Sequence, residues 1–169
     1  MTGDTTIRPV HGEDPVSVLR KAHAEQLRLC DRLEEIADSL PDNVIRQKCL
    51  YAAGALGPMI RHVHRYEEDV VFPLIAERLA GDERIEATLN RLRLEHCEDE
   101  CFAEELTEAL QALGSGAEDV NIEATGYMLR GFFEAMRRHI AFEMEHLLSK
   151  DTLSRAGLID AGLPHPHPS

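Results

Sequence analysis

Apolar residues recur at steps of three and four along four long stretches of this chain, and this spacing is typical of amphipathic helices. The stretches run over residues 16–40, 44–80, 82–113 and 119–150, and the connections between them are mostly short. No β-branched residues alternate over the length of a strand, so no strand competes with the helices. The pattern predicts an all-α protein, an up-down-up-down antiparallel four-helix bundle with a short C-terminal extension.

A length of 169 residues favours a single domain. Asp14-Pro15 is typical of a helix start, with a capping side chain followed by a proline in the first turn. We therefore expect an N-terminal arm over 1–13, the bundle over 14–150 and an extension over 151–169. The extension is predicted to hold one or two helical turns and then a largely disordered tail. Gly57-Pro58 is expected to kink or split the second helix.

The formal net charge is −13, which argues against a nucleic-acid partner and against an anionic membrane surface. No apolar run is long enough to span a membrane, and residues 1–9 lack the pattern of a secretory signal. The four cysteines are accordingly predicted to be reduced thiols of a cytoplasmic protein. We expect Cys97 and Cys101 to be small buried residues rather than redox sensors.

Nine histidines are the unusual part of the composition, and each predicted helix has one of them on its apolar stripe. These four are His23, His64, His96 and His139. The second and fourth helices add a glutamate four residues later, Glu68 and Glu143, on the same helix face as the histidine. His23 and His64 are 41 positions apart, and His96 and His139 are 43 apart, so the two halves of the chain are similar. In an antiparallel bundle, equivalent depths on the four helices converge on one point of the core.

Two carboxylates buried with four imidazoles require compensation, because an isolated buried carboxylate costs several kcal/mol even after relaxation. A pair of metal ions supplies it, and imidazole with carboxylate suits iron, manganese or zinc. Six side chains on two ions leave coordination positions open for a small molecule. Three further residues are candidates for an additional ligand or for a supporting role beside the ligands: Glu67, Glu100 and His146. Glu67 can orient an imidazole, Glu100 can be a third carboxylate ligand or a base, and His146 is placed at the boundary of the site.

Several of these motifs resemble the hemerythrin-like (HHE cation-binding) domain family over roughly residues 15–150. They are the His64-x-x-x-Glu68 segment running into Val71-Phe72-Pro73, the pair Glu95-His96, and His139-x-x-x-Glu143. The resemblance implies a non-haem di-iron site bridged by two carboxylates and an oxo or hydroxo group, with zinc or manganese as substitutes. Oxygen-carrying hemerythrins have His-x-x-x-His in the third helix, where this chain has His96-x-x-x-Glu100. The ligand pattern is closer to the di-iron proteins that repair iron–sulfur clusters.

The leading functional hypothesis is a protein that binds or senses oxygen, nitric oxide or peroxide. A second is an enzyme that decomposes peroxide or reduces nitric oxide, with electrons from a donor protein and with Glu100 or Glu67 as a proton relay. A third is iron storage or delivery, including repair of iron–sulfur centres, and a fourth is a bundle in which the metal is only a structural staple. All four stripes can be buried within one bundle, so a monomer or a weak homodimer is expected.

Overall fold

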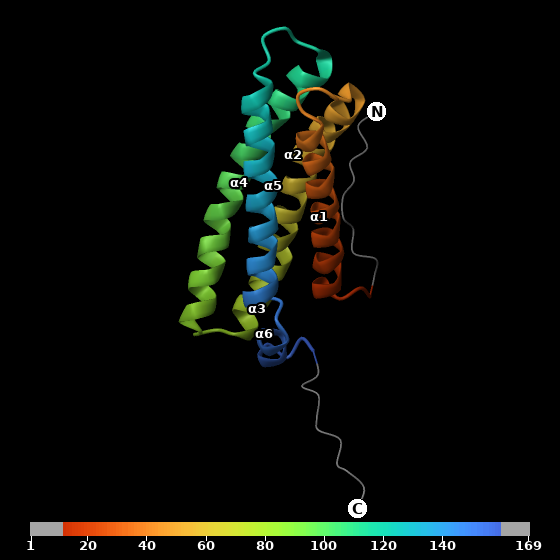
Figure 1. The fold of residues 1–169 in the computed structure, drawn as a ribbon. Coiled ribbons are helices and arrows are strands. Elements are labelled where there is room, and N and C mark those ends of the chain that lie inside the picture. The colour runs from red at the N-terminus through yellow and green to blue at the C-terminus, as the bar shows by residue number, and fades with distance from the viewer. Residues whose placement is uncertain (1–11, 160–169) are drawn as a thin grey trace, which may run out of the picture.

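The computed structural model describes residues 12–159, which form an antiparallel four-helix bundle (Figure 1). The four long helices are α1 (Pro15–Ser39), α2 (Arg46–Tyr66), α4 (Glu83–Ser115) and α5 (Ile122–His146). In Figure 1 α1 and α4 run in one direction and α2 and α5 in the other, and each helix packs on its two neighbours around a square. The predicted bundle is thus confirmed. None of the helices in the described region is long and apolar enough to cross a membrane.

The helix ends follow from local capping chemistry. Asp14, Asp82 and Asn121 accept hydrogen bonds from backbone amides in the first turns of α1, α4 and α5. Gly116 ends α4 in the left-handed conformation, with φ of 74°. A short helix, α6 (Lys150–Arg155), follows α5 where the sequence predicts one or two helical turns. Residues 1–11 of the predicted arm and 160–169 of the predicted tail lie outside the described residues.

The second stretch is interrupted, but not at the expected place. Helix α2 continues through Pro58, so Gly57-Pro58 does not split it. The interruption is η1 (Glu67–Val71), a single π-helical turn, which leads into α3 (Phe72–Arg78). In a regular α-helix the ring of Pro73 would clash with the carbonyl group of Asp69, four residues earlier. In η1 the Phe72 amide donates to the carbonyl of Glu67, five residues earlier, and this wider turn accommodates one extra residue.

The apolar core is divided into two clusters of buried side chains. One cluster extends toward the α1–α2 turn and includes Leu33, Leu56, Leu106 and Phe132. The other extends toward the start of α1 and the end of α5, and it includes Leu19, Phe72, Leu92 and Leu147. Along α1 and α4, His23 and His96 lie between the two clusters. Along α2 and α5, His64 and His139 are adjacent to Val63 and Ile140, where one cluster ends. The core therefore contains a polar layer with apolar packing on both sides.

Candidate metal centre

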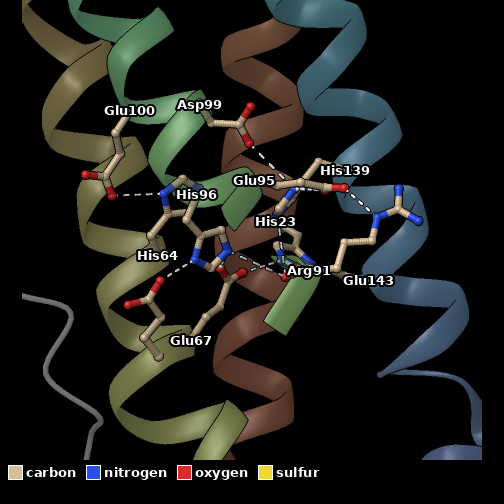
Figure 2. Close-up of polar contacts among 11 residues, drawn as sticks. His23, His64, Glu67, Arg91, Glu95, His96, Asp99, Glu100, His139 and Glu143 are labelled. Carbon is tan, nitrogen blue, oxygen red and sulfur yellow. Dashed lines mark hydrogen bonds and ion pairs between the residues drawn. The ribbon is translucent and has the colours of Figure 1, made fainter. Parts of the chain in front are cut away.

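Six polar side chains fill this layer, and all are 0–6 % exposed (Figure 2). They come from all four sides of the bundle: His23 from α1, His64 from α2, Glu67 from η1, His96 from α4, and His139 and Glu143 from α5. Buried charged groups are retained only when they are paired or bind a metal. The layer is therefore the strongest candidate for a functional site.

The ligand atoms of these side chains fall into two overlapping groups. His64, Glu67, His96 and His139 form an imidazole-rich group, whose ligand atoms all lie within 4.8 Å of one another. His23, Glu67 and Glu143 form a carboxylate-rich group, whose ligand atoms also lie within 4.8 Å of one another. Glu67 belongs to both: its Oε1 lies 3.0 Å from His23 Nε2, and its Oε2 lies 3.0 Å from His96 Nε2. One carboxylate thus offers one oxygen to each group, which is the geometry of a bridging ligand.

Many of these atoms are buried without a hydrogen bond. The Nε2 atoms of His64, His96 and His139 have no hydrogen-bond partner, and neither do both oxygens of Glu143 and Oε2 of Glu67. Leaving a buried polar atom unpaired costs about 1–3 kcal/mol, and more for a charged group. Here the unpaired atoms converge on the same small volume. A cation at each group would satisfy them, so the donor set fits two metal ions.

The outer nitrogen of each imidazole in the imidazole-rich group contacts a carboxylate on the solvent side (Figure 2). The Nδ1 atoms of His64, His96 and His139 lie 3.0, 2.7 and 3.0 Å from Glu100, Glu68 and Glu95. An ionised carboxylate can only accept, so Nδ1 carries a proton, and in the neutral form of each imidazole Nε2 has a free lone pair for a metal. Carboxylates in this position fix the ring and make the imidazole a stronger ligand.

His23 is arranged differently from the other three histidines. Its Nε2 contacts the two inner carboxylates, Glu143 at 2.7 Å and Glu67 at 3.0 Å, and its buried Nδ1 has no hydrogen-bond partner. Burial alone would lower the pKa of His23, but its short contacts with the carboxylates of Glu143 and Glu67 outweigh burial and raise the pKa to about 9. In the absence of metal, His23 therefore holds a proton between the carboxylates.

Burial and the neighbouring charges also shift the pKa values of His64, His139 and Glu143. Burial, together with the neighbouring His96 and His139, lowers the pKa of His64 to about 2, so this imidazole stays neutral. Burial would also lower the pKa of His139, but Glu143 outweighs it and raises the pKa to about 9. Burial would raise the pKa of Glu143, whereas His139 and His23 lower it below its ordinary value. Glu143 is thus kept ionised, as a metal ligand must be.

The structure puts Glu67, rather than Glu68, inside the layer. The side chain of Glu67 is 1 % exposed, whereas that of Glu68 is 40 % exposed and contacts His96 from outside. A step of seven residues, about two helical turns, leads backward from buried Ile75 to Glu68 and forward from buried Ile60 to Glu67. The extra residue in η1 makes the two counts disagree. We therefore propose Glu67, in place of the Glu68 expected from the i, i+4 spacing, as the metal ligand of this segment.

Other predicted residues lie around the layer. Glu100 is on the solvent side of His64, and exposed His146 packs against the Phe142 ring, outside both groups. Cys97 and Cys101 are exposed, so the expectation that they are buried is wrong, because both lie on the outer face of α4.

Asp99 is a residue of the site that the sequence pattern did not single out. Its Oδ2 lies 3.5 Å from His139 Nδ1, beside the contact that His139 makes with Glu95. Burial raises the pKa of Asp99 to about 6. The i, i+3 spacing from His96 was the available signal for Asp99, since it places the two side chains on neighbouring parts of one helix face.

Comparison with known proteins agrees with this geometry. The model of the Hemerythrin HHE cation binding domain family matches residues 14–150. The chain therefore belongs to this family, and the His/Glu layer is its cation-binding site. No curated protein and no solved structure matches the chain.

Proposed function

We propose that this chain is a non-haem di-iron protein that binds a small ligand, such as oxygen, nitric oxide or peroxide, in the core of the bundle. The observation that carries the proposal is the sharing of Glu67 between two ligand groups of unequal size. The imidazole-rich group offers four ligands and the carboxylate-rich group three. Iron usually takes more ligands than three, so open positions are expected at the carboxylate-rich group. A pair of iron ions held there would supply redox-active positions for the small ligand.

The surrounding residues limit what can reach those positions. The polar layer lies between two clusters of fully buried apolar side chains. The Phe72 ring stacks beside that of His96, with centroids 5.6 Å apart, so this side of the layer is closed by an aromatic side chain. Such packing limits the access of water from both ends of the layer and favours a small ligand over a larger metabolite. A ligand of two or three heavy atoms is the class that this enclosure supports.

Optical spectroscopy tests the proposal. The protein is loaded anaerobically with two equivalents of Fe²⁺ and then exposed to oxygen, nitric oxide or peroxide. We expect new absorption bands with at least one of these ligands, and a Glu143→Gln variant should weaken them because the carboxylate-rich group loses a charge. His146→Gln is a matched control outside both groups and should leave the bands unchanged. A two-iron protein whose spectrum ignores all three ligands would refute the proposal and favour a structural or storage role.

A further inference from the structure

The two ligand groups differ in the chemistry that they offer. The imidazole-rich group has three nitrogens and one oxygen, whereas the carboxylate-rich group has one nitrogen and two carboxylates. Imidazole suits borderline ions such as Fe²⁺ and Zn²⁺, whereas carboxylate oxygens suit harder ions such as Mn²⁺. The ratio of zinc affinity to manganese affinity should therefore be larger at the imidazole-rich group.

The two groups also differ in how far they are prepared for an ion. Glu100, Glu68 and Glu95 already fix the three imidazole rings through Nδ1 at 2.7–3.0 Å. The rings of His64 and His96 are stacked, with centroids 3.8 Å apart and planes within 10°. Their Nε2 atoms have no hydrogen-bond partner to give up when an ion binds. Binding at the imidazole-rich group therefore requires little reorganisation, which favours affinity.

The carboxylate-rich group must break contacts before it can bind an ion. His23 Nε2 is hydrogen-bonded to Glu67 and lies 2.7 Å from Glu143, and an ion must replace both contacts. Among residues 12–159, no carboxylate contacts the outer side of His23, where Nδ1 is buried without a hydrogen bond. Of the other three imidazoles, His96 has one such contact, with Nε2 3.0 Å from Glu67 Oε2, and His139 Nε2 is 3.5 Å from Glu143 Oε1, so the imidazole-rich group gives up fewer short contacts per nitrogen. The second ion therefore binds at a higher cost than the first.

From this contrast, and on the basis of the two-ion centre proposed above, we propose that the two positions fill in order and select different metals. The imidazole-rich group, supported by Glu68, Glu95 and Glu100, binds a borderline ion such as Fe²⁺ or Zn²⁺ first and tightly. The carboxylate-rich group binds the second ion more weakly and accepts Mn²⁺, so the chain can hold a mixed-metal centre. The three outer carboxylates are positioning residues in this arrangement, since they act on the metal only through the imidazoles.

Zinc and manganese make the test independent of redox chemistry. One equivalent of Zn²⁺ is added to the metal-free full-length protein against a competing chelator, and Mn²⁺ is then titrated while the free Mn²⁺ signal is followed by electron paramagnetic resonance. We expect one tight zinc, then one manganese bound at least about ten times more weakly, and a final Zn:Mn:protein ratio of 1:1:1. Prior addition of two equivalents of zinc should block manganese uptake.

Two variants separate the positions. Glu143→Gln should leave the first zinc within about threefold of the parent protein and abolish manganese uptake, and the retained zinc shows that the variant is folded. Glu100→Gln should weaken the first zinc by about 10- to 100-fold, because the imidazole of His64 loses its charged partner. Glu104→Gln is the matched control for Glu100→Gln, since Glu104 is an exposed glutamate one turn further along α4. It should change neither affinity.

The proposal is overturned if the first and second ions bind with the same affinity, or if Glu143→Gln weakens both to the same extent. It is also overturned if Mn²⁺ displaces the first zinc as readily as it fills the second position. These outcomes are distinct from failure of the proposed function. Ordered uptake without any response of the two-iron form to oxygen, nitric oxide or peroxide would refute small-ligand binding alone, and unordered uptake with such a response would refute the order alone.

Discussion

Glu67 and Glu68 carry the same side chain at adjacent positions, yet they have opposite environments. Glu67 contacts His23 and His96 with both of its oxygens inside the layer. Glu68 contacts only the outer nitrogen of His96 and is 40 % exposed. A carboxylate between two ions stabilises both of them by direct coordination, whereas an outer carboxylate acts only through the ring that it orients. The two residues therefore allow a direct comparison of these roles.

Glutamine substitution should separate them. Glu67→Gln removes the charge shared by both groups, so we expect iron content after anaerobic loading and desalting to fall from about two to about one ion per chain or fewer. Glu68→Gln should retain two ions, with the first bound about 10- to 100-fold more weakly. Metal analysis of both variants beside the parent protein is the measurement. Full iron content in Glu67→Gln with loss in Glu68→Gln would restore the assignment made from the i, i+4 spacing.

The cysteines make a second comparison between residues of the same type. Cys97 and Cys101 are exposed on α4, whereas Cys30 and Cys49 are each 1 % exposed. Burial raises the pKa of Cys30 to about 11 and also raises that of Cys49. Because the thiolate is the reactive form, two thiols per chain should react rapidly with a chromogenic disulfide reagent at neutral pH, and four should react after denaturation. Cys97→Ser should reduce the rapid class to one, and four rapid thiols in the native protein would contradict the packing around Cys30 and Cys49.

At the scale of the element, η1 explains why the sequence pattern predicted the fold better than the site. Helical periodicity is robust to one extra residue, so all four long helices and their histidines could be predicted from spacing alone. A π-helical turn leaves no such periodic signal. Residues 68–70 are partly or fully exposed in succession between buried Glu67 and buried Val71 and Phe72, so the i, i+4 step from His64 selects Glu68 rather than the buried Glu67. The outer contacts of Glu95 and Asp99 also depend on where α5 lies beside α4, which local spacing does not specify.

If η1 contains one extra residue, its removal should be tolerated. Deleting exposed Asp69 removes the extra residue while the residues on both sides keep their faces toward the core, and Pro73 then lies inside an α-helix, as Pro58 does in α2, at a cost of about 3 kcal/mol. We expect the deletion variant to remain folded and to unfold cooperatively, with a lowered melting temperature and with zinc still bound.

Deleting Glu105, an exposed residue within regular α4, is the control for this prediction. That deletion turns every later residue of α4 by about 100° and moves Leu106 and Leu110 out of the core, so it should cost several kcal/mol and prevent cooperative unfolding. Circular dichroism melts compare the two deletions. Equal loss of structure in both would show that η1 does not hold an extra residue.

At the scale of the whole molecule, the charged layer separates two apolar clusters that would otherwise form one continuous core. The bundle is thus stabilised by apolar packing at both ends, and its middle depends on what occupies the layer. Bound ions that interact only with the folded protein stabilise it by mass action, so removal of metal should destabilise the bundle. Without metal, protons held by the histidines are the remaining positive charge beside Glu67 and Glu143.

The stability of the metal-free protein should therefore depend on pH in a defined direction. His23 and His139 have pKa values raised to about 9, and His96 is also raised above its ordinary value because its contacts with Glu67 and Glu68 outweigh the opposing effect of burial. Between pH 6.5 and 9 the folded protein keeps protons that the unfolded chain releases, so the free energy of unfolding falls as pH rises. His64 is neutral in the folded protein, and in the unfolded chain it becomes neutral above its ordinary pKa of 6.5, so its opposing contribution is confined to the lower end of this range. Thermal melts in the presence of a chelator at constant ionic strength should show a falling melting temperature from pH 6.5 to 9, with a smaller slope in His23→Gln. The zinc-loaded protein should show little of this trend, because its imidazoles bind ions instead of protons, and a flat profile for the metal-free protein would contradict the protonated layer.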